Sequence, residues 1–120
     1  MSHDLDFRQL VATAGDAIVV SDADGLITYW NAAATRIFGF AEADALGASL
    51  DIIIPERLRE RHWEGYHKTM ASGQTRYGSD LLRVPALNVH GDTLSIAFTV
   101  SLLSDEEGRA VMRLLIRNRT

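Results

Sequence analysis

The chain contains no cysteine. Disulfide bonds, zinc–thiolate sites and cysteine nucleophiles are therefore excluded. It also lacks any apolar run near the ~20 residues that a membrane-spanning helix needs. The N-terminus, M-S-H-D-L-D, is acidic and has no apolar core of a signal peptide. These absences predict a cytoplasmic domain without a membrane partner.

An excess of positive charge is missing as well. The 12 Lys and Arg residues are outnumbered by 16 Asp and Glu residues, which gives a net charge of −4 at pH 7. A nucleic-acid-binding surface needs a clustered basic face, whereas the arginines of residues 57–61 alternate with glutamate. No phosphate-binding loop, dinucleotide fingerprint or nucleophile-elbow motif is present. We therefore expect neither a nucleic-acid partner nor enzymatic activity.

The most informative stretch is 55–73, P-E-R-L-R-E-R-H-W-E-G-Y-H-K-T-M-A-S-G. A proline suits the first turn of a helix, and a glycine suits the left-handed position just past its end. At 3.6 residues per turn, one apolar stripe of this helix contains Leu58, His62, Tyr66 and Met70. The sequence thus places one imidazole on the apolar side of a charged helix.

The remaining segments predict a sheet and several short helices. Residues 93–103 alternate between apolar and polar side chains, so we expect a central or next-to-central strand with Phe98 buried. Pro85 restricts its own strand to an edge or a bulge. The predicted strands are 17–22, 26–30, 75–87, 93–103 and 110–117, and the predicted short helices are 4–14, 32–38 and 42–46. This order indicates an α+β fold in which helices cover one face of a five-stranded antiparallel sheet.

The helix predicted at 4–14 has an irregular apolar face, and it divides the chain into a flanking helix, 1–15, and a single domain, 16–120. Two interpretations stay open at this point. The helix either covers the sheet of its own domain or forms a dimer contact. We expect a homodimer through this helix.

The chain resembles the PAS domain family over nearly its whole length. The matching pieces are A-I-V-V-S-D-A-D-G-L-I-T-Y-W-N-A-A-A-T-R-I-F-G-F, the segment E-A-D-A-L-G, and H-G-D before the long alternating strand. The resemblance implies a sensory domain that binds a small ligand, pairs with a second copy and serves a kinase, a cyclase or another output domain.

The helix I-P-E-R-L-R-E-R-H-W-E-G-Y-H resembles that of oxygen-sensing haem PAS domains, in which the iron-binding histidine follows a proline by seven residues. Pro55 and His62 have this spacing, which implies haem b with His62 as the iron ligand. These sensors carry an arginine on the next strand that contacts dioxygen. Here an ungapped count places Leu82 at that position and Arg83 one residue later. Either a bulge redirects Arg83 or the arginine is lacking, and Tyr77 is then a candidate polar group on that side.

The ligand is expected between the long helix and the sheet. The residues predicted to surround it are Ile52, Ile53, Leu58, Tyr66, Ile96, Phe98 and Val100. His62 and His67 are five residues apart, about 140° around a helix, so they cannot share one metal; His67 is the fallback ligand.

The alternative function is a PAS domain that binds flavin or a metabolite, or no ligand, and acts in dimerisation. The absence of cysteine excludes the thiol-dependent photochemistry of flavin-photosensing and coumaroyl PAS domains. A non-covalent flavin could stack on Trp30, Trp63 or Tyr66, but we expect these aromatic side chains to pack in the core instead.

Overall fold

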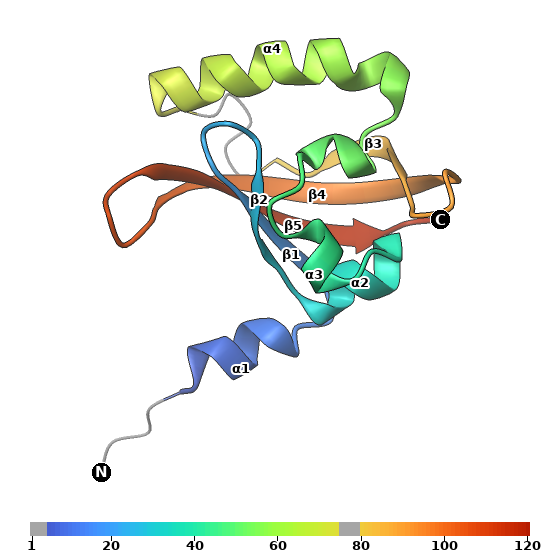
Figure 1. Cartoon of the computed structure of the whole chain (residues 1–120), viewed down its shortest axis with the longest axis horizontal. Helices are drawn as coiled ribbons and strands as arrows, with labels where there is room; N and C mark the ends of the chain where they lie inside the picture. Colours follow the sequence, from blue (N-terminus) through green and yellow to red (C-terminus); the bar gives the residue numbers. More distant parts are fainter. Residues whose placement is uncertain (1–4, 75–79) are drawn as a thin grey trace.

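A computed structural model describes residues 5–74 and 80–120. Its sheet has the order β2-β1-β5-β4-β3, and all neighbouring strands are antiparallel (Figure 1). The strands are β1 (Ala17–Ser21), β2 (Ile27–Trp30), β3 (Leu82–Leu87), β4 (Thr93–Ser104) and β5 (Ala110–Asn118). The predicted α+β fold with a five-stranded antiparallel sheet is confirmed. β4 lies next to the central strand β5, and β3, which contains Pro85, lies at an edge, as predicted.

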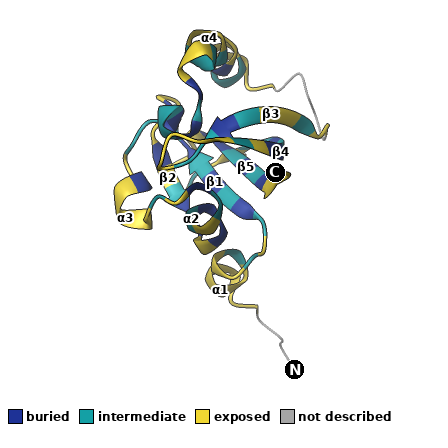
Figure 2. Ribbon diagram, turned by 90° about the vertical axis from the view of Figure 1, so that its right-hand side faces the viewer, coloured by how far each residue is buried: buried dark blue, intermediate teal, exposed yellow. Residues whose placement is uncertain are grey.

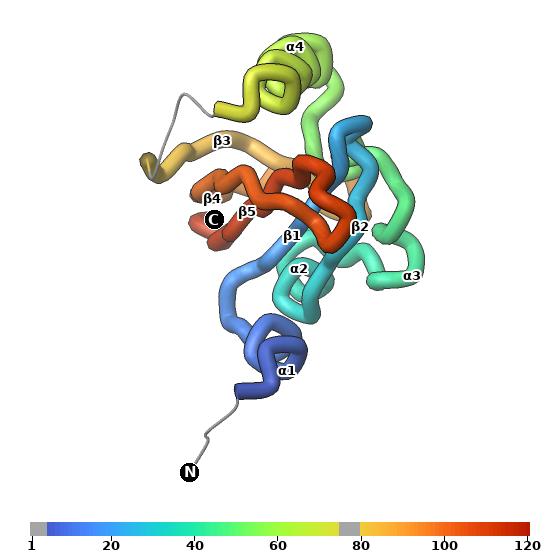
Figure 3. Tube along the Cα trace, turned by 90° about the vertical axis from the view of Figure 1, so that its left-hand side faces the viewer, coloured from blue at the N-terminus to red at the C-terminus, as the bar shows by residue number. Residues whose placement is uncertain are grey.

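The helices are α1 (Phe7–Ala12), α2 (Ala32–Phe38), α3 (Glu42–Ala45), the 3₁₀ turn η1 (Leu50–Ile53) and α4 (Glu56–Ser72). α2 begins where the Asn31 side chain accepts a hydrogen bond from the backbone N–H of Ala34. α4 follows Pro55 and ends at Gly73, whose φ of 71° is left-handed. α4 and α1 lie at opposite ends of the molecule with the sheet between them (Figures 1 and 3).

The sheet buries mainly one face. In register across three strands, Val19 pairs with Leu114 and Leu114 with Val100, and all three are buried. Residues directly opposite in an antiparallel pair share a face, so this row marks the side covered by the helices. Phe98 lies on the same side but is only half-buried, because it borders the space beneath α4 described below. The prediction that Phe98 is buried was therefore correct only in part.

Two sequence expectations need correction. The helix predicted at 4–14 spans Phe7–Ala12 and buries none of its residues; Phe7 is 69% exposed and Leu10 53%. Asn31 donates through Nδ2 to the carbonyls of Val11 and Asp16, which ties the end of α1 to the start of β1. Because α1 buries none of its side chains and extends away from the sheet (Figure 2), the interpretation that it covers its own sheet is wrong. The strand predicted at 75–87 begins at Leu82, and residues 75–79 lie outside the described part of the chain.

Candidate functional site

A cleft of about 760 Å³ lies between α4 and the helix-covered face of the sheet. We call it the α4 cleft. This volume falls within the ~300–1,000 Å³ typical of small-molecule sites. Strands β3, β4 and β5 form its floor, and α4 and η1 form its walls. Of the residues predicted for the site, those that border the cleft are Ile53, Leu58, His62, Tyr66, Leu82, Arg83, Ile96, Phe98 and Val100.

One described residue that was predicted for the site, Ile52, does not border the cleft. Ile52 packs against the core without lining the cleft, while its neighbour Ile53 does line it. Successive residues of a 3₁₀ turn point about 120° apart, so only one of these two isoleucines reaches the cleft. Tyr77 lies outside the described residues.

His62 is half-buried on the α4 wall of the cleft. Its Nδ1 atom is buried and has no hydrogen-bond partner within residues 5–74 and 80–120. Burial lowers the pKa of His62, the nearby Asp51 carboxylate opposes this shift, and His67 adds to it. The ring is thus favoured in its neutral form, the form in which imidazole binds metals. It also makes no hydrogen bond in the described structure that would give it a purely structural role.

Tyr66, one turn further along α4, is fixed firmly. Its side chain is 4% exposed, and its hydroxyl donates to the Asp22 carbonyl at 2.5 Å. Because this donation uses the only hydroxyl proton of Tyr66, Ser21 Oγ donates the hydrogen bond that joins the two oxygens at 2.8 Å. Burial raises the pKa of Tyr66, so the phenol stays protonated. These bonds connect the wall of the cleft to the end of β1.

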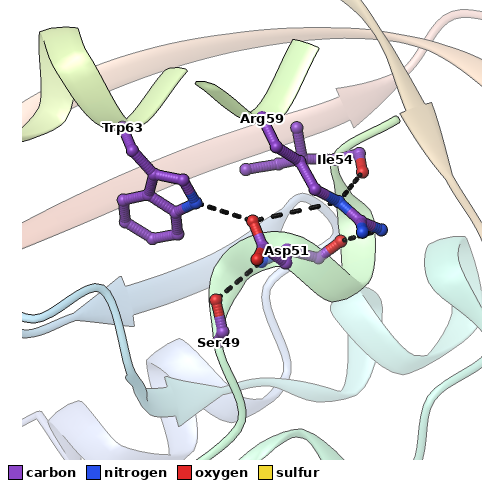
Figure 4. A network of polar contacts seen from close by, with 5 residues as sticks. All are labelled: Ser49, Asp51, Ile54, Arg59 and Trp63. Atoms are coloured by element: carbon purple, nitrogen blue, oxygen red, sulfur yellow. Dashed lines mark hydrogen bonds and ion pairs between the residues drawn. The ribbon is translucent and has the colours of Figure 1, made fainter. Parts of the chain in front are cut away.

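The first half of α4 is fixed to η1 by polar contacts around Asp51 (Figure 4). Trp63 Nε1 donates to Asp51 Oδ1 at 2.7 Å, and Arg59 Nε lies 3.9 Å from the same oxygen. Arg59 also donates to the carbonyls of Ile54 and Asp51, at 3.0 and 3.2 Å. Trp63 and Arg59 are neighbours of His62 on the helix, so these contacts hold the imidazole against the cleft.

The tryptophans do not face the α4 cleft. The ring of Trp63 packs on Gly25 so closely that a Cβ atom there would lie 2.1 Å from it. Trp30 is 1% exposed, and its Nε1 donates to Thr35 Oγ1 and to the Phe40 carbonyl. Neither tryptophan is therefore available to stack on a bound flavin, and the expected packing role of these aromatics in the core is confirmed. Of the three, Tyr66 also borders the cleft.

His67, the fallback iron ligand, is exposed and lies outside the cleft lining. Its ring stacks on Trp63 at a centroid distance of 5.9 Å. Of the two histidines of α4, only His62 is placed to meet a ligand.

The register of β3 separates Leu82 from Arg83. Leu82 pairs with Phe98, and Phe98 pairs with Ile116, which is buried. Arg83 pairs with Ala97 on the opposite face of the sheet, and it is exposed, although it borders the cleft at this edge. The β3–β4 register contains no irregularity, so no bulge redirects Arg83. The strand position facing the cleft carries an apolar side chain.

Sequence reasoning missed the charged rim of the cleft. Arg57, Arg61, Glu64 and Lys68 border it at helical spacing, although the pattern suggested only a solvated face. Lys68 lies 3.5 Å from Glu64, whereas Arg57 and Arg61 form no ion pair in the described structure. The sequence did hold a signal for the two arginines: Arg57 and Arg61 directly precede Leu58 and His62, which belong to the apolar stripe of the helix.

The family is shown by a match to a model described as PAS fold, over residues 5–117. The chain belongs to the PAS family. The matched range includes α1, so the predicted division between residues 15 and 16 stays a prediction. Within the described residues, none of the helices is both long and apolar enough to cross a lipid bilayer.

Known proteins resemble this PAS domain over parts of their length. An uncharacterized protein of Azorhizobium caulinodans is 32% identical over 78% of this chain and 13% of its own. The sensor protein FixL of Bradyrhizobium diazoefficiens is 36% identical over 51% of this chain and 12% of its own. The chain thus spans about an eighth of each relative. A PAS domain structure from Colwellia psychrerythraea superposes with a TM-score of 0.74, at 22% identity, over 94% of this chain and 92% of that one.

Proposed function

We propose that this sensory PAS domain binds haem b in the α4 cleft through His62 and senses a diatomic gas or a redox state. The observation that carries the proposal is the imidazole itself. It is half-buried, burial lowers its pKa, and it forms no hydrogen bond within the described residues, on the wall of a cleft with an apolar floor.

A lone histidine favours haem over a bare metal ion. The described residues contain no group of three or more His, Cys, Asp or Glu side chains that could hold an ion. In haem the porphyrin itself holds the iron, so one axial side chain from the protein is sufficient. The iron would supply the gas-binding or one-electron chemistry, and the protein would supply the axial ligand, orientation and an apolar enclosure.

The surroundings of His62 would set the properties of such a site. A histidine ligand orients its ring through a second hydrogen bond from its other nitrogen. Here the orientation would come instead from the packing of α4, which Trp63 and Arg59 fix to η1. The rings of Trp63 and Tyr66 lie 4.6 and 5.6 Å from the His62 ring between centroids.

The strand facing His62 bears on the choice of gas. Leu82 offers no hydrogen-bond donor, and Arg83 belongs to the opposite face of β3. A charge-assisted contact with dioxygen would therefore be missing. We expect carbon monoxide or nitric oxide to bind in preference to oxygen, unlike the oxygen-sensing domains that this helix resembles.

The signal would leave the domain through β1 and α1. Tyr66 links the cleft to Ser21 at the end of β1, and the exposed apolar side chains of α1 suit a contact with a second copy. We therefore propose a homodimer through α1. The greater length of both relatives supports attachment to an output region, such as a kinase or cyclase.

The alternative is a PAS domain that binds another small ligand, or none, and acts in dimerisation. Reconstitution with hemin separates the two functions. The wild-type domain should take up one equivalent of hemin and develop a Soret band. His62→Ala should abolish that band, while His67→Ala, the matched change at the exposed histidine of α4, should preserve it. Equal hemin uptake by wild type and His62→Ala would contradict the proposal and favour the alternative.

A further inference from the structure

We propose that Arg57 and Arg61 form a carboxylate-binding site at the mouth of the α4 cleft. The ligand class is a small molecule with an apolar body and at least one carboxylate. This inference rests on the proposed function because it places the ligand in the same cleft. It adds that the ligand carries a negative charge.

The two arginines are placed together beside the apolar floor. They are four residues apart on α4, so they lie on the same side of the helix, one turn from each other. Both border the cleft, as do Leu58 and His62, which follow them in the sequence. A ligand that fills the apolar space beneath α4 would therefore present any polar end near this pair.

Neither arginine has another role in the described structure. Arg59, between them in the sequence, uses its guanidinium to hold η1, and Lys68 pairs with Glu64. No hydrogen bond or ion pair within residues 5–74 and 80–120 involves the side chain of Arg57 or Arg61. In a chain with a net charge of −4, two exposed guanidinium groups without a partner among the described residues thus border the α4 cleft.

Guanidinium groups suit carboxylates specifically. Their planar, fixed arrangement of N–H donors matches the two oxygens of a carboxylate, and the resulting charge-assisted bonds are stronger than neutral ones. Two chemical sources share these features: a porphyrin with carboxylate side chains, such as haem b, and a linear alkyl carboxylate. An uncharged analogue of either would keep the apolar contacts and lose the polar ones.

The test uses four probes: hemin, hemin dimethyl ester, dodecanoate and dodecanol. Each is titrated into the wild-type chain, into Arg57→Gln/Arg61→Gln, and into Arg36→Gln/Arg119→Gln. The last variant removes the same charge from exposed arginines outside the cleft lining. We expect the cleft variant to bind the carboxylate probe about tenfold more weakly, which corresponds to ~1.4 kcal/mol. Its affinity for the matching ester or alcohol should stay within about twofold of wild type, and the control should bind all probes as wild type does.

The outcomes separate this inference from the haem proposal. If hemin binds through His62 but the cleft variant and wild type have equal affinity for hemin, the arginine site is wrong and the haem site survives. If hemin does not bind but dodecanoate does, and the cleft variant weakens it, the haem site is wrong and the arginine site survives. If both carboxylate probes fail to bind the wild-type chain, the arginine site is overturned as well.

Discussion

Replacing Tyr66 by phenylalanine removes the hydroxyl that joins α4 to the end of β1 and keeps the ring that packs in the core. The hydroxyl takes part in two hydrogen bonds, with Asp22 at 2.5 Å and Ser21 at 2.8 Å. Each is worth about 1 kcal/mol net, and leaving a buried polar atom without its partner adds to the cost. Ser21 is 0% exposed, so water cannot replace the lost partner. We expect Tyr66→Phe to lower the free energy of unfolding by about 2 kcal/mol.

Urea-induced unfolding followed by circular dichroism measures this loss as a lower midpoint with an unchanged slope. Tyr29→Phe is the matched control, because the Tyr29 hydroxyl forms no hydrogen bond within the described residues; it should cost less than about 0.5 kcal/mol. A cycle with Ser21→Ala and the double variant should give a coupling energy of about 1 kcal/mol. A Tyr66→Phe domain as stable as wild type, or strictly additive effects in the cycle, would refute the proposed link.

Three further changes test the support of the site. Gly25→Ala should destabilise the domain far more than Gly108→Ala in urea unfolding, because both glycines have φ of 78° but only Gly25 touches the tryptophan of α4; equal losses would contradict that packing. Asp51→Ala should lower the free energy of unfolding by about 1 kcal/mol and weaken hemin binding; unchanged values would show that its contacts do not hold α4. The lowered pKa of His62 means that the unfolded chain binds the proton more readily, so unfolding free energy should fall as pH drops below about 6.5. In thermal melts across this range, His62→Gln should flatten the fall and His90→Gln should keep it, and identical pH profiles would contradict the shift.

Local signals in the sequence accounted for most of the elements. Pro55 and Gly73 bound α4 because a helix start and a helix end each depend on a few neighbouring residues. The alternation in 93–103 identified β4 because one of its faces is buried. These features need no knowledge of distant segments.

Contacts between distant segments could not be read in this way. Tyr66 and Ser21 are 45 residues apart, and no local pattern indicates that their hydroxyls meet. Likewise, the close packing of Trp63 on Gly25 joins α4 to the β1–β2 turn.

The strand beside α4 shows the same limit at the level of single residues. A count through the loop cannot decide between Leu82 and Arg83, because a shift by one residue exchanges the two faces of a strand. The choice between them required the pairing of β3 with β4.

The central claim is that His62 supplies the axial ligand of haem. Its most direct test is the absorption spectrum of hemin-loaded His62→Gly with and without free imidazole, beside His67→Gly with the same cost to the helix. We predict that His62→Gly loses the wild-type spectrum, that added imidazole restores it by occupying the vacated space, and that His67→Gly resembles wild type throughout. A wild-type spectrum in His62→Gly without imidazole would contradict the account.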